Sequence, residues 1–269
     1  MMPFIHIGPV TLASFGLCVG IAMFVAYFVL ARDVRRRGIS APADLLVAVP
    51  CIAGLIGAKL YHVFEDPRLL MANPHELISQ YGFAWFGGLL GGLAGFVWMA
   101  HRYRVPLLEM FDAASPAAAL GYGIGRIGCL VSGDGDYGKP TSLPWGMSFP
   151  HGLVPTTQKV HPTPIYELIV AILIFWWLWK LGGRQAVAHM KSLKVKKDAP
   201  ASVAIPHGAV FAQYLILTGI ARFLVEFIRI NPRSFLGMTN AQTAALGSII
   251  LGALLLWHLR TKRKASAAK

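Results

Sequence analysis

Two arginines, Arg126 and Arg222, lie inside apolar stretches that are otherwise typical of membrane-spanning helices. A guanidinium group at membrane depth costs at least ~2.5–3.5 kcal/mol, so an anion must share its site. In the second stretch, Thr218, Arg222 and Glu226 recur at intervals of four and share one face of a helix. A structural ion pair between Arg222 and Glu226, facing the interior of a helix bundle, is one interpretation of this pattern.

A phosphate ester is the other candidate anion. The planar guanidinium group binds phosphate through two parallel hydrogen bonds, and near a membrane surface the abundant phosphate is a lipid head group. Arg126, Arg222 and Lys59 face few carboxylates within the apolar stretches. We therefore expect positive charge in excess, which favours binding of an anionic membrane lipid.

The composition is that of a membrane protein, since 55% of the 269 residues are hydrophobic and only 14% are charged. Seven apolar stretches are long enough to be helical spans. We expect an all-α, polytopic membrane protein with seven transmembrane helices in one integral-membrane domain, 1–269, with spans at about 10–31, 43–64, 83–100, 113–132, 164–181, 207–228 and 239–259. In the third span, Gly87, Gly91 and Gly95 share a face that allows a neighbouring helix to approach closely.

Most lysines and arginines lie in alternate loops, after the first, third and fifth spans, and in the C-terminal tail. This asymmetry predicts an N-terminus outside and a C-terminus in the cytoplasm. Residues 133–163 then form an extracytoplasmic loop, and 182–205 form a basic cytoplasmic loop. Because the net charge of +13 is explained by orientation, we do not expect nucleic acid as a partner. The three cysteines show no metal-binding spacing, and we expect neither metal nor cofactor.

Polar and glycine-rich motifs follow one another over most of the chain. They comprise Lys59, then Gly125, Arg126, Gly128, Asp134, Tyr137 and Gly138, then His161, Tyr166 and Glu167, and finally Arg222, Glu226 and Arg229. Together these motifs resemble those of prolipoprotein diacylglyceryl transferases. The resemblance implies an enzyme of the bacterial inner membrane, which moves the diacylglyceryl group of phosphatidylglycerol to the lipobox cysteine thiol of a preprolipoprotein and releases glycerol phosphate.

The resemblance also suggests roles for individual residues. Cations beside a leaving phosphate stabilise its developing charge, and we assign this catalytic role to Arg126 and Arg222. Glu226 and Asp134 orient these arginines or a substrate hydroxyl, and His161 is a candidate base. Expected substrate-binding residues are Lys59, Gly125, Gly128, Tyr137, Gly138, Tyr166 and Arg229.

Some positions depart from the family pattern. Phe86 stands where many members have a histidine that is a favoured base candidate, and Cys129 stands where an asparagine is frequent. His161 or His62 could then deprotonate the thiol, or no dedicated base is needed, because a thiol beside arginines is partly ionised near neutrality. Two alternatives therefore stay open: a related transferase with another acceptor, and a non-catalytic protein that binds anionic lipid.

Overall fold

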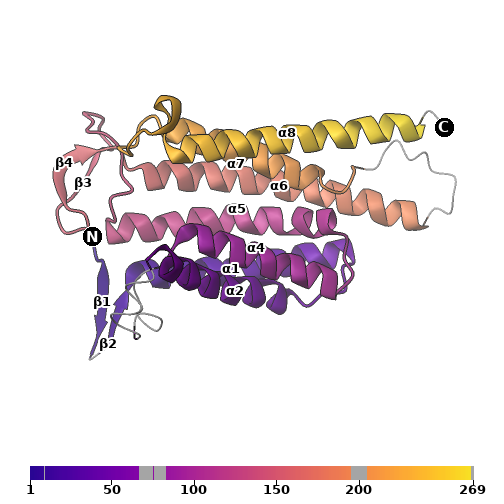
Figure 1. Ribbon diagram of the computed structural model, residues 1–269, viewed down its shortest axis with the longest axis horizontal. Helices are drawn as coiled ribbons and strands as arrows, with labels where there is room; N and C mark the ends of the chain where they lie inside the picture. Colours follow the sequence, from indigo (N-terminus) through magenta and orange to yellow (C-terminus); the bar gives the residue numbers. More distant parts are fainter. Residues whose placement is uncertain (9, 67–74, 76–82, 195–204, 268–269) are drawn as a thin grey trace. The chain divides into compact units, whose positions relative to one another are not determined.

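The computed structural model describes residues 1–8, 10–66, 75, 83–194 and 205–267, and most of these residues are helical (Figure 1). The chain divides into two compact units. Unit 1 comprises Met1–Arg37 and Phe111–Lys269, and unit 2 comprises Gly38–Met110. The elements in chain order are β1 Phe4–Ile7, β2 Val10–Ala13, α1 Ser14–Arg37, α2 Ala43–Glu65, α4 Trp85–Arg102, α5 Leu107–Ser132, β3 Met147–Phe149, β4 Thr156–Val160, α6 Thr163–Lys194, α7 Ala209–Val225, the short 3₁₀ helix η2 Phe235–Gly237, and α8 Asn240–Ala267.

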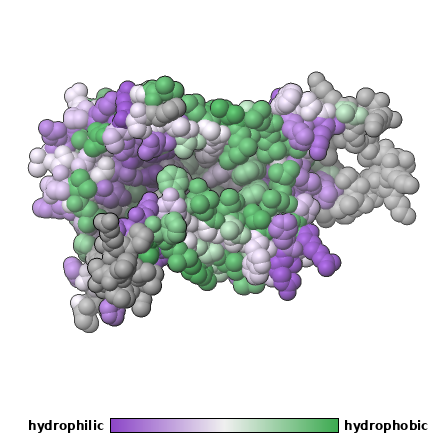
Figure 2. Space-filling model, in the orientation of Figure 1, coloured by the Kyte–Doolittle hydropathy of each residue, from purple (hydrophilic) through white to green (hydrophobic). Residues whose placement is uncertain are grey.

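Every apolar stretch expected to span the membrane corresponds to a helix of the structure. Within the described ranges, four helices are long and apolar enough to cross a bilayer: Ser14–Arg37, Ala43–Glu65, Thr163–His189 and Asn240–Arg263. Figure 2 shows hydrophobic residues covering the middle of α8 and hydrophilic residues at its basic C-terminal part. The chain is therefore a helical membrane protein with several spans.

The start of the first span differs from the expectation. Residues 10–13 belong to a hairpin in which β2 pairs antiparallel with β1, and the helix begins only at Ser14. Gly8, with φ at +60°, permits the tight turn between the strands. The helix also continues past the expected end at residue 31, because the buried Asp33 pairs with Arg36 and Arg37 in its last turn.

The basic loop was expected at 182–205, but this start is too early, because α6 continues as a helix to Lys194. Tertiary contacts of Gln185 explain the extension. This buried side chain accepts a hydrogen bond from Arg37 at 2.5 Å and donates to Asp112 at 2.7 Å. Lys196 and Lys197 lie outside the described residues.

Asp112 fixes the N-terminus of α7. Its side chain is fully buried and accepts hydrogen bonds from the backbone N–H groups of Gly208 and Phe211, both at 2.7 Å. These N–H groups have no partner within the helix itself, and a carboxylate at a helix N-terminus also compensates the helix dipole. Asp112 therefore holds α7 against α5, and through Gln185 against α6.

The helices of unit 1 pack closely through small residues. A Cβ added at Gly252 of α8 would lie 2.7 Å from the carbonyl oxygen of Ala212 in α7, and one at Gly219 would lie 2.9 Å from that of Ala245. Glycine is therefore required where these backbones meet. Figure 1 shows α5, α6, α7 and α8 running side by side, with β3 and β4 beyond the end of α5 and the start of α6.

A small apolar core stabilises the β3–β4 hairpin. Tyr137 stacks on Phe149 with ring centroids 5.2 Å apart, and both are buried together with Val160. The Tyr137 hydroxyl donates to the carbonyl of Val154 at 3.2 Å. This core holds the loop that follows α5 against the strand that leads into α6.

In unit 2, α2 and α4 are in direct backbone contact. A Cβ at Gly87 would overlap the carbonyl oxygen of Gly57, and one at Gly91 would overlap that of Ala53. The close approach expected from the glycine stripe of the third span is confirmed, with α2 as the neighbouring helix.

Candidate active site

Five segments of unit 1 bring charged side chains together. Arg126 lies near the end of α5, Glu167 lies one turn into α6, and Arg222 lies in the last turn of α7. Asp136 belongs to the loop after α5, and Arg229 follows the end of α7. Gly138 and Arg229 form an isolated antiparallel β-bridge, so the α5 loop and the chain after α7 are joined by their backbones.

Arg126 and Arg222 converge on the same oxygen atom of Glu167. The Oε1 atom of Glu167 lies 3.0 Å from Arg222 Nη1 and 3.4 Å from Arg126 Nε, and it also accepts a hydrogen bond from the Tyr122 hydroxyl. The guanidinium of Arg126 stacks over the Tyr122 ring, 4.8 Å from its centroid. The two arginines expected to meet from separate helices are therefore brought together.

Further contacts join Asp136, Glu226 and Arg229 to the charged cluster. Asp136 binds Arg126 through one carboxylate oxygen and Arg229 through the other. Glu226 Oε2 lies 2.8 Å from Arg222 Nη2, which is the ion pair that the spacing in the sequence indicates, and Asn231 donates to Glu226 Oε1 at 2.6 Å.

The expected excess of positive charge is wrong for this cluster. Arg126, Arg222 and Arg229 are matched by three carboxylates, those of Asp136, Glu167 and Glu226. The sequence does not indicate this balance, because Asp136 and Glu167 lie at the ends of the apolar stretches and meet the arginines only in the folded chain. The cluster is not sealed, however, since the side chains of Arg222 and Asp136 are 24% and 28% exposed.

Asp136, rather than Asp134, holds the arginines. Burial raises the pKa of Asp136, but the hydrogen bond and charge of Arg229 and the charge of Arg126 outweigh it, so the pKa lies below its ordinary range. The same contact holds the pKa of Arg229 above its ordinary value despite burial. Burial and the neighbouring Asp136 raise the pKa of Asp134, whose carboxylate accepts the backbone N–H of Asp136 at 3.2 Å.

Cys129, Asp134 and Asp136 are the described residues that come closest to a metal-binding group, with ligand atoms within 4.8 Å of one another. Both oxygens of Asp136 already accept hydrogen bonds from guanidinium groups. A cation there would have to displace two arginines, so the arrangement favours binding of anions over metals.

His161 lies beside Tyr166 at the start of α6. Its Nδ1 is 3.2 Å from the Tyr166 hydroxyl, which also accepts a hydrogen bond from Nε1 of the exposed Trp145 at 2.8 Å. The neighbouring residue Glu167 points into the charged cluster, while Tyr166 and His161 form a separate polar group on the same helix end.

The predicted glycines have different surroundings. A Cβ at Gly125 would meet nothing within 4 Å, so there is open space beside Arg126. A Cβ at Gly128 would touch Phe15 and Cys18 of α1, and one at Gly138 would lie 2.6 Å from the carbonyl oxygen of Ile228. Gly128 therefore permits helix packing, and Gly138 permits the bridge to Arg229.

Two other predicted substrate-binding residues have surroundings of their own. Tyr137 is part of the hairpin core described above. Lys59 belongs to unit 2, where its buried side chain lies in α2 with the ammonium 5.1 Å from the centroid of the Phe83 ring. Its role in binding stays a prediction.

Three residues of the cluster were not expected as site residues: Tyr122, Asp136 and Glu167. Glu167 is an ionisable residue within an apolar helix, and such residues are functional candidates by default. That signal would have identified it from the sequence alone. The choice between Asp134 and Asp136 depends on the path of the loop, which no local pattern specifies.

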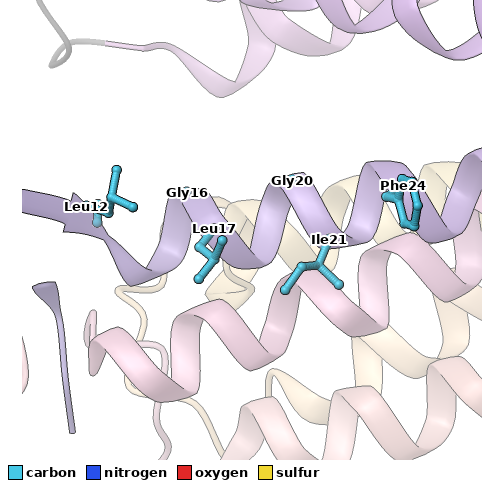
Figure 3. Close-up of a pocket in the computed structure, with 7 residues that line it drawn as sticks. Leu12, Gly16, Leu17, Gly20, Ile21 and Phe24 are labelled. Carbon is cyan, nitrogen blue, oxygen red and sulfur yellow. The ribbon is translucent and has the colours of Figure 1, made fainter. Parts of the chain in front are cut away.

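An apolar pocket of about 500 Å³ lies along one face of α1 and is separate from these charged groups (Figure 3). Gly16 and Gly20 leave it open, and Leu17, Ile21 and Phe24 line it. The same helix packs against Gly128 of α5 through Phe15 and Cys18, neither of which lines the pocket.

Comparison with known proteins agrees with the motifs in the sequence. The family model for prolipoprotein diacylglyceryl transferase matches residues 3–258. Proteins named phosphatidylglycerol–prolipoprotein diacylglyceryl transferase are similar to this chain. That of Clostridium tetani is 31% identical, and the similarity covers 89% of this chain and 90% of the relative. That of Synechococcus elongatus is 28% identical, and the similarity covers 96% of this chain and 88% of the relative. The chain belongs to the prolipoprotein diacylglyceryl transferase family.

Proposed function

We propose that the protein transfers the diacylglyceryl group of phosphatidylglycerol to the lipobox cysteine thiol of preprolipoproteins and releases glycerol phosphate. One observation carries this proposal: Arg126 and Arg222, from different helices, share one oxygen atom of Glu167. Two guanidinium groups at this spacing suit a phosphate, whose oxygens accept hydrogen bonds from both. The names of the relatives specify the same lipid and the same acceptor protein.

The reaction follows from the chemistry of this pair. The thiolate of the acceptor attacks the glyceryl carbon, and the bond from that carbon to the phosphate oxygen breaks. Negative charge then develops on the departing phosphate, and the two guanidinium groups stabilise it in a site partly shielded from water. Glu226 and Asn231 hold Arg222 in place, and Asp136 holds Arg126 and Arg229.

In this proposal the seven helices span the bacterial inner membrane, with the N-terminus outside and the C-terminus in the cytoplasm. The arginine cluster then lies near the outer leaflet, together with the 133–163 loop. The basic C-terminal part of α8 supports this orientation, because lysine and arginine are enriched on the cytoplasmic side. The apolar pocket on α1 suits the acyl chains of the lipid.

Turnover tests the function directly. Purified protein is incubated with vesicles that contain phosphatidylglycerol, with and without a lipobox peptide, and glycerol phosphate is measured. We expect release only when the peptide is present. Release without peptide, or no release with it, would reject the assignment, and phosphatidylethanolamine vesicles serve as the lipid control.

Labelling tests the orientation. Ser148 and Thr261 are exposed in the structure, so Ser148→Cys and Thr261→Cys are introduced separately into a chain without its native cysteines. In intact spheroplasts, a membrane-impermeant maleimide should label position 148 and not position 261. The reverse pattern would overturn the proposed orientation.

A further inference from the structure

Glu167 is the central carboxylate of the charged cluster. Its side chain is 5% exposed, and three charged groups and one hydroxyl surround it: Arg126 and Tyr122 from α5, Arg222 from α7, and Arg229 from the segment that follows. Oε1 receives the contacts from Tyr122, Arg126 and Arg222. Oε2 is buried, lies 3.6 Å from Arg229 Nη1, and accepts no hydrogen bond from the described residues.

The other two carboxylates of the cluster have closer partners. Asp136 binds one arginine with each oxygen, and Glu226 binds Asn231 with one oxygen and Arg222 with the other. Glu226 Oε2, like Glu167 Oε2, accepts no hydrogen bond from the described residues, but Arg222 Nη2 lies only 2.8 Å from it, whereas Glu167 Oε2 is 3.6 Å from Arg229 Nη1. Glu167 Oε2 is therefore the oxygen of these carboxylates that its arginine partner holds least closely. A buried acceptor without a donor is costly, and such an atom is suited to receive a proton.

The balance of charge also favours proton uptake by a carboxylate of the cluster. The cluster holds three guanidinium groups and three carboxylates, so the phosphodiester of a bound lipid adds one negative charge that no cation of the cluster compensates. In a buried site such an excess is relieved when a carboxylate takes up a proton. The phosphate also competes with Glu167 for Arg126 and Arg222, the two arginines that contact its Oε1.

We propose that Glu167 is the general base of the reaction and accepts the proton of the acceptor thiol. This inference rests on the proposed function. The proton moves from the thiol to Glu167 Oε2, the thiolate sulfur forms a bond to the glyceryl carbon, and the electron pair of the broken carbon–oxygen bond leaves with glycerol phosphate. The proton then passes from Glu167 to the departing phosphate or to water. Phe86, by contrast, has no atom that can accept a proton.

The test compares Glu167→Gln with the wild type in full-length protein, using phosphatidylglycerol vesicles and two lipobox peptides, one with cysteine and one with selenocysteine. Glutamine keeps the shape and the hydrogen-bond acceptor of the side chain but cannot take the proton. A selenol is already ionised at neutral pH and needs no base. We expect turnover with the cysteine peptide to fall about 10²–10⁴-fold at pH 7, and turnover with the selenocysteine peptide to fall by less than about tenfold.

The pH profile gives a second readout that a purely structural role would not produce. The rate of Glu167→Gln with the cysteine peptide should rise with pH as the thiol ionises by itself, while binding of phosphatidylglycerol stays within about threefold of wild type. Equal losses with both peptides at every pH would overturn the proposal. If Glu167→Gln does not fold, Glu167→Asp takes its place and should retain base-dependent turnover with the cysteine peptide; loss with both peptides would again overturn it. Failure of the wild type with both peptides would reject the proposed function itself.

Discussion

Gly138 and Arg229, which are far apart in the sequence, face each other as an isolated antiparallel bridge. The neighbouring Lys139 N–H donates to the carbonyl of Ile228 at 2.7 Å, and the Gly138 N–H donates to the backbone carbonyl of His161 at 2.8 Å. These backbone bonds place Arg229 beside Asp136 and tie both to the start of α6. The geometry of the charged cluster thus depends on Gly138, a position where a side chain would not fit.

Gly138→Ala should therefore disturb the cluster, because its Cβ would lie 2.6 Å from the Ile228 carbonyl oxygen. We expect a lower melting temperature and a loss of turnover. Gly125→Ala is the matched control, since its Cβ meets nothing within 4 Å, and it should melt at the wild-type temperature. Thermal unfolding in detergent and glycerol phosphate release measure both effects. An unchanged Gly138→Ala protein would contradict the role given to the bridge.

Arg126→Ala and Arg222→Ala should each lower turnover by about 10²–10³-fold, because each removes one charge-assisted donor to the leaving phosphate. Lysine at either position cannot bind the phosphate through two parallel hydrogen bonds and should restore only a small part of the rate. Arg233→Ala, which changes an exposed arginine of the loop after α7, is the control and should retain wild-type turnover. Full activity of Arg222→Ala would remove that side chain from the mechanism.

Phe86→His should be tolerated or should increase turnover, because a histidine at this position adds a proton acceptor without removing a charge from the cluster. Phe86 is 58% exposed in unit 2, so the smaller ring leaves no buried cavity. Steady-state rates with the lipobox peptide, compared with those of Phe86→Leu, separate the effect of the imidazole from that of lost aromatic volume. A Phe86→His protein that melts normally but turns over more slowly than Phe86→Leu would contradict this expectation.

Asp112→Ala should lower stability by about 2–3 kcal/mol, since it leaves two backbone N–H groups at the start of α7 without their buried acceptor. The melting temperature in detergent should fall by about 5–10 °C. Asp44→Ala removes an exposed aspartate from the first turn of α2 and should change it by less than about 2 °C. Equal melting temperatures for the two variants would show that Asp112 does not fix α7.

Stability should also depend on the protonation of Asp136. Its pKa in the folded protein is held below its ordinary value of 3.8 by Arg229 and Arg126. A carboxyl group with a lowered pKa stabilises the fold above its unfolded pKa, and this contribution is lost as the pH falls through the folded pKa. Melting temperatures of the wild type should therefore fall as the pH is lowered from 5 towards 3, and Asp136→Asn should show a weaker fall. Parallel curves for both proteins would disprove this coupling.

The helical architecture was largely predictable from the sequence because long apolar runs and flanking charges determine where helices form. The β1–β2 hairpin was missed since its apolar residues resemble the start of a span, and their pairing depends on the turn at Gly8. The continuation of α6 beyond residue 181 was missed for another reason: contacts of Gln185 with Arg37 and Asp112 are distant in the sequence.

The candidate site was predictable in part. The meeting of Arg126 and Arg222 followed from the cost of isolated charges in a bilayer, and the Arg222–Glu226 pair followed from their helical spacing. The balance of charge could not be predicted from the sequence, because it depends on Asp136 and Glu167, which come from a loop and from the start of another helix. Which carboxylate faces which arginine is decided by tertiary structure.

The direct backbone contact of α2 and α4 has a consequence for the order of assembly. Apolar side chains gain nothing from leaving lipid for protein, so helices in a bilayer associate through close van der Waals packing. Glycines at the contact lose no side-chain conformational entropy when the helices pair. We therefore expect α2 and α4, which follow one another among the described helices, to associate soon after insertion, before the remaining helices pack.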